Sequence, residues 1–234
     1  MLKKLIIVFA SGLVLSLVAI SMAFVIGGEE LRNAIHDDEL HWTIGDEDDG
    51  PRESREFAFD PDTLLTVRIP VELRFERGEE AKMVVEGSAR SIDDVTFEGN
   101  VLDIDGEGIS SGGFSVKIVA PSLKGLALEA PGNVKLRSLD QDAFSVTAEG
   151  AVDVDAEGKV AQLTLDSEGV GNLDFREVDA RVAKVRLEGV GNAHVSASDL
   201  VDVELEGIGS LTLHRKPDRL VSQIDGIGRV KHNY

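Results

Sequence analysis

Acidic side chains are the residues of this sequence that could most readily do chemistry, because four of them recur at one spacing. Each stands directly before a short corner motif, and successive copies lie 18 to 20 residues apart: Glu149, Glu168, Glu188 and Glu206. If they form a column, it is a candidate binding surface for divalent cations or for basic groups of a partner, with one carboxylate per step and therefore weak affinity, about 10⁻⁴ to 10⁻³ M. The competing interpretation is a solvated strip that the fold tolerates.

Two other acidic runs resemble the start of a calcium-binding loop, at residues 103–108 and 153–158. An EF-hand loop needs a bidentate glutamate at its twelfth position. Phe114 and Thr164 occupy that position instead. We therefore expect these aspartates to lie on an outward, solvated strand face.

The histidines are scattered along the chain, and none lies at metal-ligand spacing with a third ligand nearby. His194 and His214 stand at nearly equivalent positions of the repeat described below, so we expect them to stack on one face. A weak metal site there is the alternative interpretation. The remaining histidines are His36, His41 and His232.

Catalytic patterns are not apparent. The glycine pairs, such as Gly169 and Gly171, lack the third glycine and the following helix of a dinucleotide-binding loop. A polysaccharide-active enzyme needs a pair of carboxylates that stands out from the rest, and here carboxylates occupy many outward positions. We expect a non-enzymatic protein with no catalytic residues and no cofactor.

The composition of the chain limits the classes of partner and ligand that it can bind. The formal net charge is −19 and no basic stripe is visible, which disfavours nucleic acid as a ligand. The chain has no cysteine, which excludes disulfides and thiolate metal sites. Aromatic residues make up 5 %, so the core must be mostly aliphatic.

One short motif returns six times in the C-terminal half, with its acidic residue at positions 129, 149, 168, 188, 206 and 225. Between these copies apolar and polar residues alternate, as in Val201–Glu206, which is typical of half-buried strands. A step of about 19 residues is too short for a propeller blade or a helical repeat and fits one coil of a β-solenoid. We expect one residue of each copy to stack in a corner ladder: Asn133, Asp153, Asn172, Asn192, Ser210 and Arg229.

The preceding segment, from Phe57 to Ala120, predicts less regular strands. Thr66–Phe75 alternates cleanly, and Arg77–Glu80 predicts a hairpin turn before Lys82–Glu86. A second hairpin is expected from Asp93–Phe97 and Val101–Ile104 around the Gly99-Asn100 turn. The predicted fold is all-β, a solenoid with an irregular N-terminal hairpin region.

The N-terminal segment predicts export. Lys3 and Lys4 precede an uncharged run of membrane-spanning length at residues 5–26, and acidic residues follow it. Residues 1–28 are either a retained membrane anchor or a signal peptide cleaved after Ala23. We expect residues 29–56 to be an acidic flexible linker and residues 57–234 to be the folded body, outside the cytoplasmic membrane in either case.

The opening strands, the segment Ser115–Lys124 and the repeated Gly-Val-Gly-Asn and Gly-Ile-Gly corners resemble the auto-transporter adhesin head GIN domain, which is grouped with toastrack-type envelope domains. The resemblance covers residues 57–234. It implies a right-handed single-stranded β-helix in the bacterial envelope and supplies no catalytic residues. The corners at Ala130-Pro131, Ala151-Val152 and Arg229 depart from the family pattern, which puts the regularity of those coils in doubt.

Three functional hypotheses follow. The leading one is a non-enzymatic, adhesin-like binding domain of the cell envelope, with an envelope protein or a polysaccharide as partner. The second is an envelope-stress sensor or scaffold subunit that regulates a membrane partner. The third is a polysaccharide-active β-helix enzyme.

Overall fold

The computed structural model describes residues 51–105 and 113–234. These residues form strands and no helix, so the described part of the chain holds no helix that could cross a membrane. The predicted N-terminal helix, at residues 1–28, lies outside the described residues. In chain order the strands are β1 (Arg52–Phe57), β2 (Leu65–Val67), β3 (Val71–Arg77), β4 (Lys82–Ser88), β5 (Val95–Glu98), β6 (Val101–Ile104), β7 (Phe114–Ala120), β8 (Gly125–Leu128), β9 (Gly132–Ala148), β10 (Ala151–Ser167), β11 (Val170–Leu187), β12 (Val190–Leu205), β13 (Ile208–Leu213), β14 (Arg219–Ile224) and β15 (Ile227–His232).

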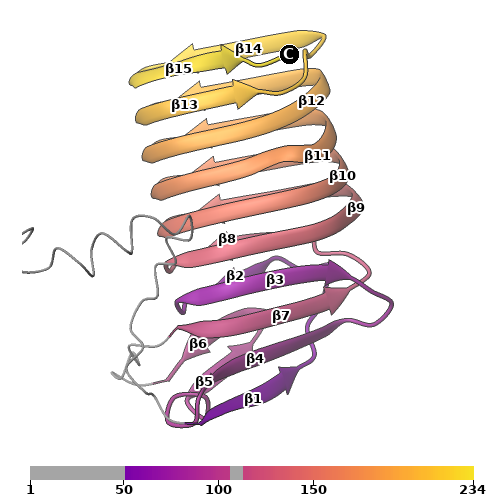
Figure 1. Ribbon diagram of the computed structural model, residues 1–234, viewed down its shortest axis with the longest axis vertical. Helices are drawn as coiled ribbons and strands as arrows, with labels where there is room; N and C mark the ends of the chain where they lie inside the picture. Colours follow the sequence, from indigo (N-terminus) through magenta and orange to yellow (C-terminus); the bar gives the residue numbers. More distant parts are fainter. Residues whose placement is uncertain (1–50, 106–112) are drawn as a thin grey trace, which may run out of the picture. The chain divides into compact units, whose positions relative to one another are not determined.

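The long strands β9 to β12 each make one full coil, and successive coils stack in parallel (Figure 1). Their register is continuous except for shifts near the middle of each strand. The two halves of a long strand have different neighbours. The first half of β12 pairs with β13 and its second half pairs with β14, so the chain turns a corner within the strand. The strands β13 and β14 together make the next coil. The predicted all-β solenoid is confirmed.

Two faces enclose the core. The first face runs β1-β4-β7-β3 and continues through the first halves of β9 to β12 to β13 and β15. The second runs β5-β6-β2-β8 and continues through the second halves of the same strands to β14. Inward side chains stack from coil to coil, and each buried aliphatic side chain contributes roughly 1.5–3 kcal/mol. One such column, at most 2 % exposed, consists of Val134, Val154, Leu173, Ala193 and Leu211.

The predicted hairpin between Thr66–Phe75 and Lys82–Glu86 is wrong. β3 and β4 do not pair, because β7 lies between them, parallel to β3 and antiparallel to β4. β3 also pairs in parallel with β9, where Leu73 meets Val134 and is fully buried. Its alternating sequence therefore fits an internal coil position. A local turn signal carries no information about a strand that arrives later in the sequence.

The second predicted hairpin is confirmed: β5 and β6 pair antiparallel, from Val95 with Ile104 to Glu98 with Val101. Gly99 and Asn100 both have left-handed backbone angles, with φ of 57° and 63°. Two adjacent left-handed residues are what a tight two-residue hairpin turn requires.

The folded body begins before the expected boundary at residue 57. Residues 52–57, most of which were expected in the flexible linker, form β1, an edge strand paired antiparallel with β4. Its sequence is charged and largely exposed, as edge strands often are. Phe57 anchors the strand by packing against Phe97, with ring centroids 5.7 Å apart.

Candidate functional site

One edge of the solenoid, where each coil passes from the second face to the first, carries three parallel columns of outward side chains. The first is the acid column, Glu149, Glu168, Glu188 and Glu206. Two residues further on is an apolar ridge, Val170, Val190, Ile208 and Ile227. Two residues beyond that is the polar column, Asn133, Asp153, Asn172, Asn192 and Ser210, with Arg229 at its end.

Glycines between the columns allow this edge to form. The backbones of successive coils approach so closely here that a Cβ on Gly189 would overlap the carbonyl oxygen of Gly169, and one on Gly209 would overlap that of Gly191. Only glycine fits at such positions. The result is a ridge of β-branched side chains that projects between two columns of bare backbone.

The acid column is exposed except at Glu188, which is half-buried. The guanidinium of Arg186 lies 2.5 Å from Glu188 and 3.6 Å from Glu204. The charge of Glu188, more than that of Glu204, raises the pKa of Arg186. Among the described residues, Glu149, Glu168 and Glu206 form no ion pair, which leaves three carboxylates of the column available to a partner.

The polar column is held by side-chain hydrogen bonds between neighbouring coils. Asn172 donates from its amide nitrogen to Asp153 Oδ1 at 3.0 Å, and Asn192 donates in the same way to Asn172 Oδ1 at 3.2 Å. The hydroxyl of Ser210 donates to Asn192 Oδ1 at 2.8 Å. Asn133 and Arg229 are in register with the others, so the structure places all six predicted corner residues in one column.

His194 and His214 lie on the first face of the last coils. His194 Nδ1 is 2.9 Å from His214 Nε2, and the ring centroids are 5.1 Å apart. That separation places both nitrogens close to the line between the rings, which is the geometry of an N–H···N hydrogen bond rather than of two ligands converging on a metal ion. Burial lowers the pKa of His194, which favours its neutral form.

Three of the described acidic side chains in the two calcium-like runs form ion pairs, and residues 106–108 of the first run lie outside the described residues. Asp155 and Glu157 both contact Arg137, at 2.8 and 3.2 Å, and Asp103 lies 3.6 Å from Arg68. Within residues 51–105 and 113–234, no three His, Cys, Asp or Glu side chains gather at metal-binding distances.

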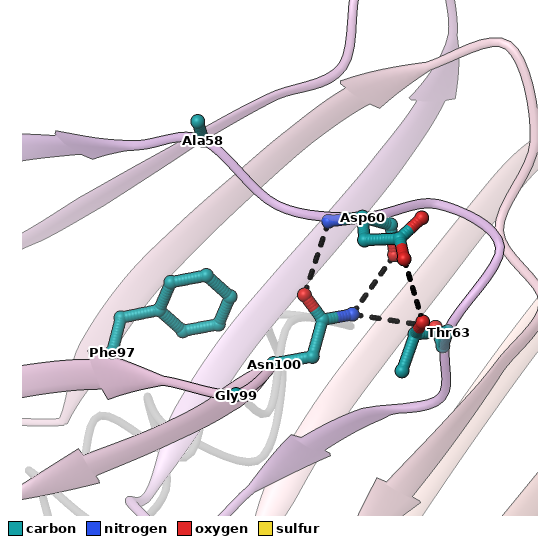
Figure 2. Close-up of a pocket in the computed structure, with 6 residues that line it drawn as sticks. All are labelled: Ala58, Asp60, Thr63, Phe97, Gly99 and Asn100. Atoms are coloured by element: carbon teal, nitrogen blue, oxygen red, sulfur yellow. Dashed lines mark hydrogen bonds between the residues drawn. The ribbon is translucent and has the colours of Figure 1, made fainter.

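A shallow hollow of about 420 Å³ lies near the other end of the molecule (Figure 2). Its floor is a clamp in which Asn100 accepts from the Asp60 amide at 3.0 Å and donates to the carbonyls of Asp60 and Thr63. The hydroxyl of Thr63 donates to Asp60 at 2.7 Å and, with the Asp62 amide, lowers the pKa of Asp60. The polar groups of Asn100 and Asp60 form their hydrogen bonds with each other and with the loop. We therefore interpret the hollow as a structural feature.

Sequence reasoning missed the apolar ridge. Its four members are 49–77 % exposed, the largest value being that of Ile227. The available signal was a β-branched residue between two glycines in the last four copies of the motif, a pattern that we had explained only as a turn. Arg55 was missed as well: it donates to the carbonyls of Ile92, Asp93 and Val95.

Comparison with known proteins adds the following. A family model described as "Putative auto-transporter adhesin, head GIN domain" matches residues 63–217. A putative adhesin from Bacteroides fragilis is 18 % identical, with a TM-score of 0.64, over 78 % of this chain and 97 % of its own. A putative adhesin from Parabacteroides distasonis has 17 % identity and a TM-score of 0.49, over 79 % of this chain and 98 % of its own.

A third solved structure, a putative lipid binding protein from the same species, has 19 % identity and a TM-score of 0.47, over 78 % of this chain and 97 % of its own. No curated protein matches the chain significantly. The Bacteroides structure supports the fold, and the family model covers about two thirds of the sequence. The chain therefore belongs to the family of auto-transporter adhesin head GIN domains.

Proposed function

We propose that this chain is a non-enzymatic binding domain of the bacterial cell envelope, adhesin-like and displayed outside the cytoplasmic membrane. The observation that carries the proposal is the apolar ridge beside the acid column. Contiguous exposed apolar side chains on a strongly acidic protein mark an interaction surface. The family, whose description names an adhesin, is consistent with this role.

The proposal includes the location. Lys3 and Lys4 ahead of the apolar run at residues 5–26 favour a C-terminus outside the cytoplasm, whether the run stays as an anchor or is cleaved. We also take the coils to wind right-handed, as the resemblance implies and as parallel crossover connections generally do. A C-terminal reporter that is active only in the cytoplasm should be silent.

Binding to envelopes tests the function. The full chain, held in nanodiscs of phosphatidylcholine, is mixed with bacterial envelope fragments, and the fraction that sediments with them is measured. The double variant Val190→Thr/Ile208→Thr keeps β-branched side chains but makes the ridge polar, and we expect it to sediment several-fold less. The matched control is Leu64→Thr/Val221→Thr, which changes two exposed apolar residues away from the ridge. Sedimentation of the wild-type chain no greater than that of empty nanodiscs would exclude the proposed function.

A further inference from the structure

We infer that the partner presents an amphipathic α-helix, which lies along the apolar ridge with lysines or arginines over the acid column. This inference rests on the proposed binding function and names the chemistry of its partner. It follows from the spacing of the ridge and from the charge beside it.

The spacing of the ridge suits a helix. Coils stack about 4.8 Å apart, and an α-helix advances about 5.4 Å per turn. Across the four ridge residues, from Val170 to Ile227, the mismatch accumulates to only about 2 Å. Apolar residues at positions i, i+4, i+7 and i+11 of a helix of about 12 residues can therefore contact all four side chains.

An extended strand along the same line suits the ridge less well. Its same-face side chains lie about 7 Å apart and lose register with the coils after one step. Amphipathic helices that contact a partner through apolar residues at these spacings are common in peptide recognition.

The charge beside the ridge specifies the polar side of the helix. Glu168 and Glu206 flank Val170 and Ile208, are exposed, and form no ion pair among the described residues. The opposite flank of the ridge is the polar column, whose Asn172 and Asn192 are neutral. A helix with basic residues along one side of its apolar stripe matches both flanks, whereas an acidic helix is repelled.

The probe is a 14-residue peptide of leucine and lysine, with its leucines in one helical stripe and its lysines beside it. A second peptide has the same composition in shuffled order, so that its leucines spread around the helix. Each is titrated into the full chain in phosphatidylcholine nanodiscs, with empty nanodiscs as the blank. We expect the striped peptide to bind, and Val190→Thr/Ile208→Thr to raise its Kd at least tenfold.

The acidic flank has its own variant, Glu168→Gln/Glu206→Gln, which should raise the Kd several-fold and flatten its dependence on salt. These exposed positions also keep the test decisive if the threonine variant fails to fold. The control Leu64→Thr/Val221→Thr should leave the Kd unchanged. Equal binding of the shuffled peptide, or a Kd insensitive to both ridge and acid variants, would overturn the inference.

Competition separates this inference from the proposed function. An excess of the striped peptide should release the chain from envelope fragments, and protease treatment of the fragments should abolish retention. Retention that depends on Val190 and Ile208 but survives protease and peptide would identify a ligand that is not a protein, such as a glycan or a lipid. That result would reject the helical partner and leave the binding function intact.

Discussion

The coils from Gly132 to Leu213 and the region from Arg52 to Ala120 form the same two faces by different means. In the coils, each strand lies beside its neighbour in sequence, and main-chain hydrogen bonds repeat at every step. In the N-terminal region, strands from distant segments of the chain lie side by side, and single polar side chains connect them by hydrogen bonds to backbone groups. Arg55 binds three carbonyls, and Asn100 clamps the loop that holds Asp60 and Thr63.

This difference indicates which contacts each region needs for its stability. The stability of the coils depends on the close contact between the backbones of successive coils at the glycine corners. This contact is repeated at every coil. The N-terminal region depends on a few side chains that satisfy backbone groups which no neighbouring strand reaches.

The largest effect is expected from Gly189→Ala. The new Cβ meets backbone atoms of Gly169 and Glu168, which cannot move without shifting a whole coil. We expect a loss of about 3 kcal/mol or more in the free energy of unfolding, measured by denaturant titration. Gly113→Ala is the control, because a Cβ there makes ordinary contacts with Pro70. Equal losses in both variants would remove the distinction between corner and surface glycines.

The second largest effect is expected at the clamp formed by Asn100. Asn100→Ala removes three hydrogen bonds and places an alanine at a φ of 63°, so we expect a loss of about 2–3 kcal/mol. Asn100→Gly removes the same bonds without the backbone strain and should cost less. Hydrogen exchange should show the loss first in β5 and β6. If the alanine and glycine variants are equally stable, the left-handed backbone is not part of the effect.

The polar column should matter less, because its members are exposed except for the buried Ser210. Replacing both Asn172 and Asn192 with leucine breaks the three side-chain hydrogen bonds that join four successive coils, and we expect a loss of about 1–2 kcal/mol in the free energy of unfolding. The same change at Ser196 and Ser198, further along the same coil, is the comparison and should cost less. Matching losses from thermal unfolding of the two double variants would show that the column adds nothing to the stacking.

The smallest effect concerns pH. Burial lowers the pKa of His194 in the folded chain, while Asp174 opposes and Arg176, His214 and Lys231 reinforce that shift. The unfolded chain therefore takes up this proton first, so stability is unaffected above a pH of about 6.5 and falls as the pH drops below it. His194→Gln should unfold with a flatter dependence on pH between 7.5 and 5. An unchanged slope would assign the pH dependence to other groups.

Much of the fold could be predicted from the sequence, because the glycine corners repeat and each strand alternates. The placement of β3 could not, since nothing in Val71–Arg77 specifies that β7 and β9 will enclose it. At the candidate site, the positions of Glu168 and Asn172 followed from the repeat. The exposure of Val170 was missed because valine in a strand is ordinarily buried, although Val170 lies two residues before the outward Asn172 and therefore on the same side of the strand.

The position of β3 has a consequence for folding order. Val71 pairs with Gly132, which is 61 residues further along the chain, whereas coil neighbours such as Gly132 and Val152 are 20 residues apart. Pairings between distant segments form slowly, because the entropy cost of closing a long loop comes before any stabilising contact is made. We expect assembly of β3 between β7 and β9 to limit the folding rate, and the later coils to add quickly, each on a finished neighbour. A chain exported N-terminus first would therefore hold its earliest strands incomplete until β9 has emerged.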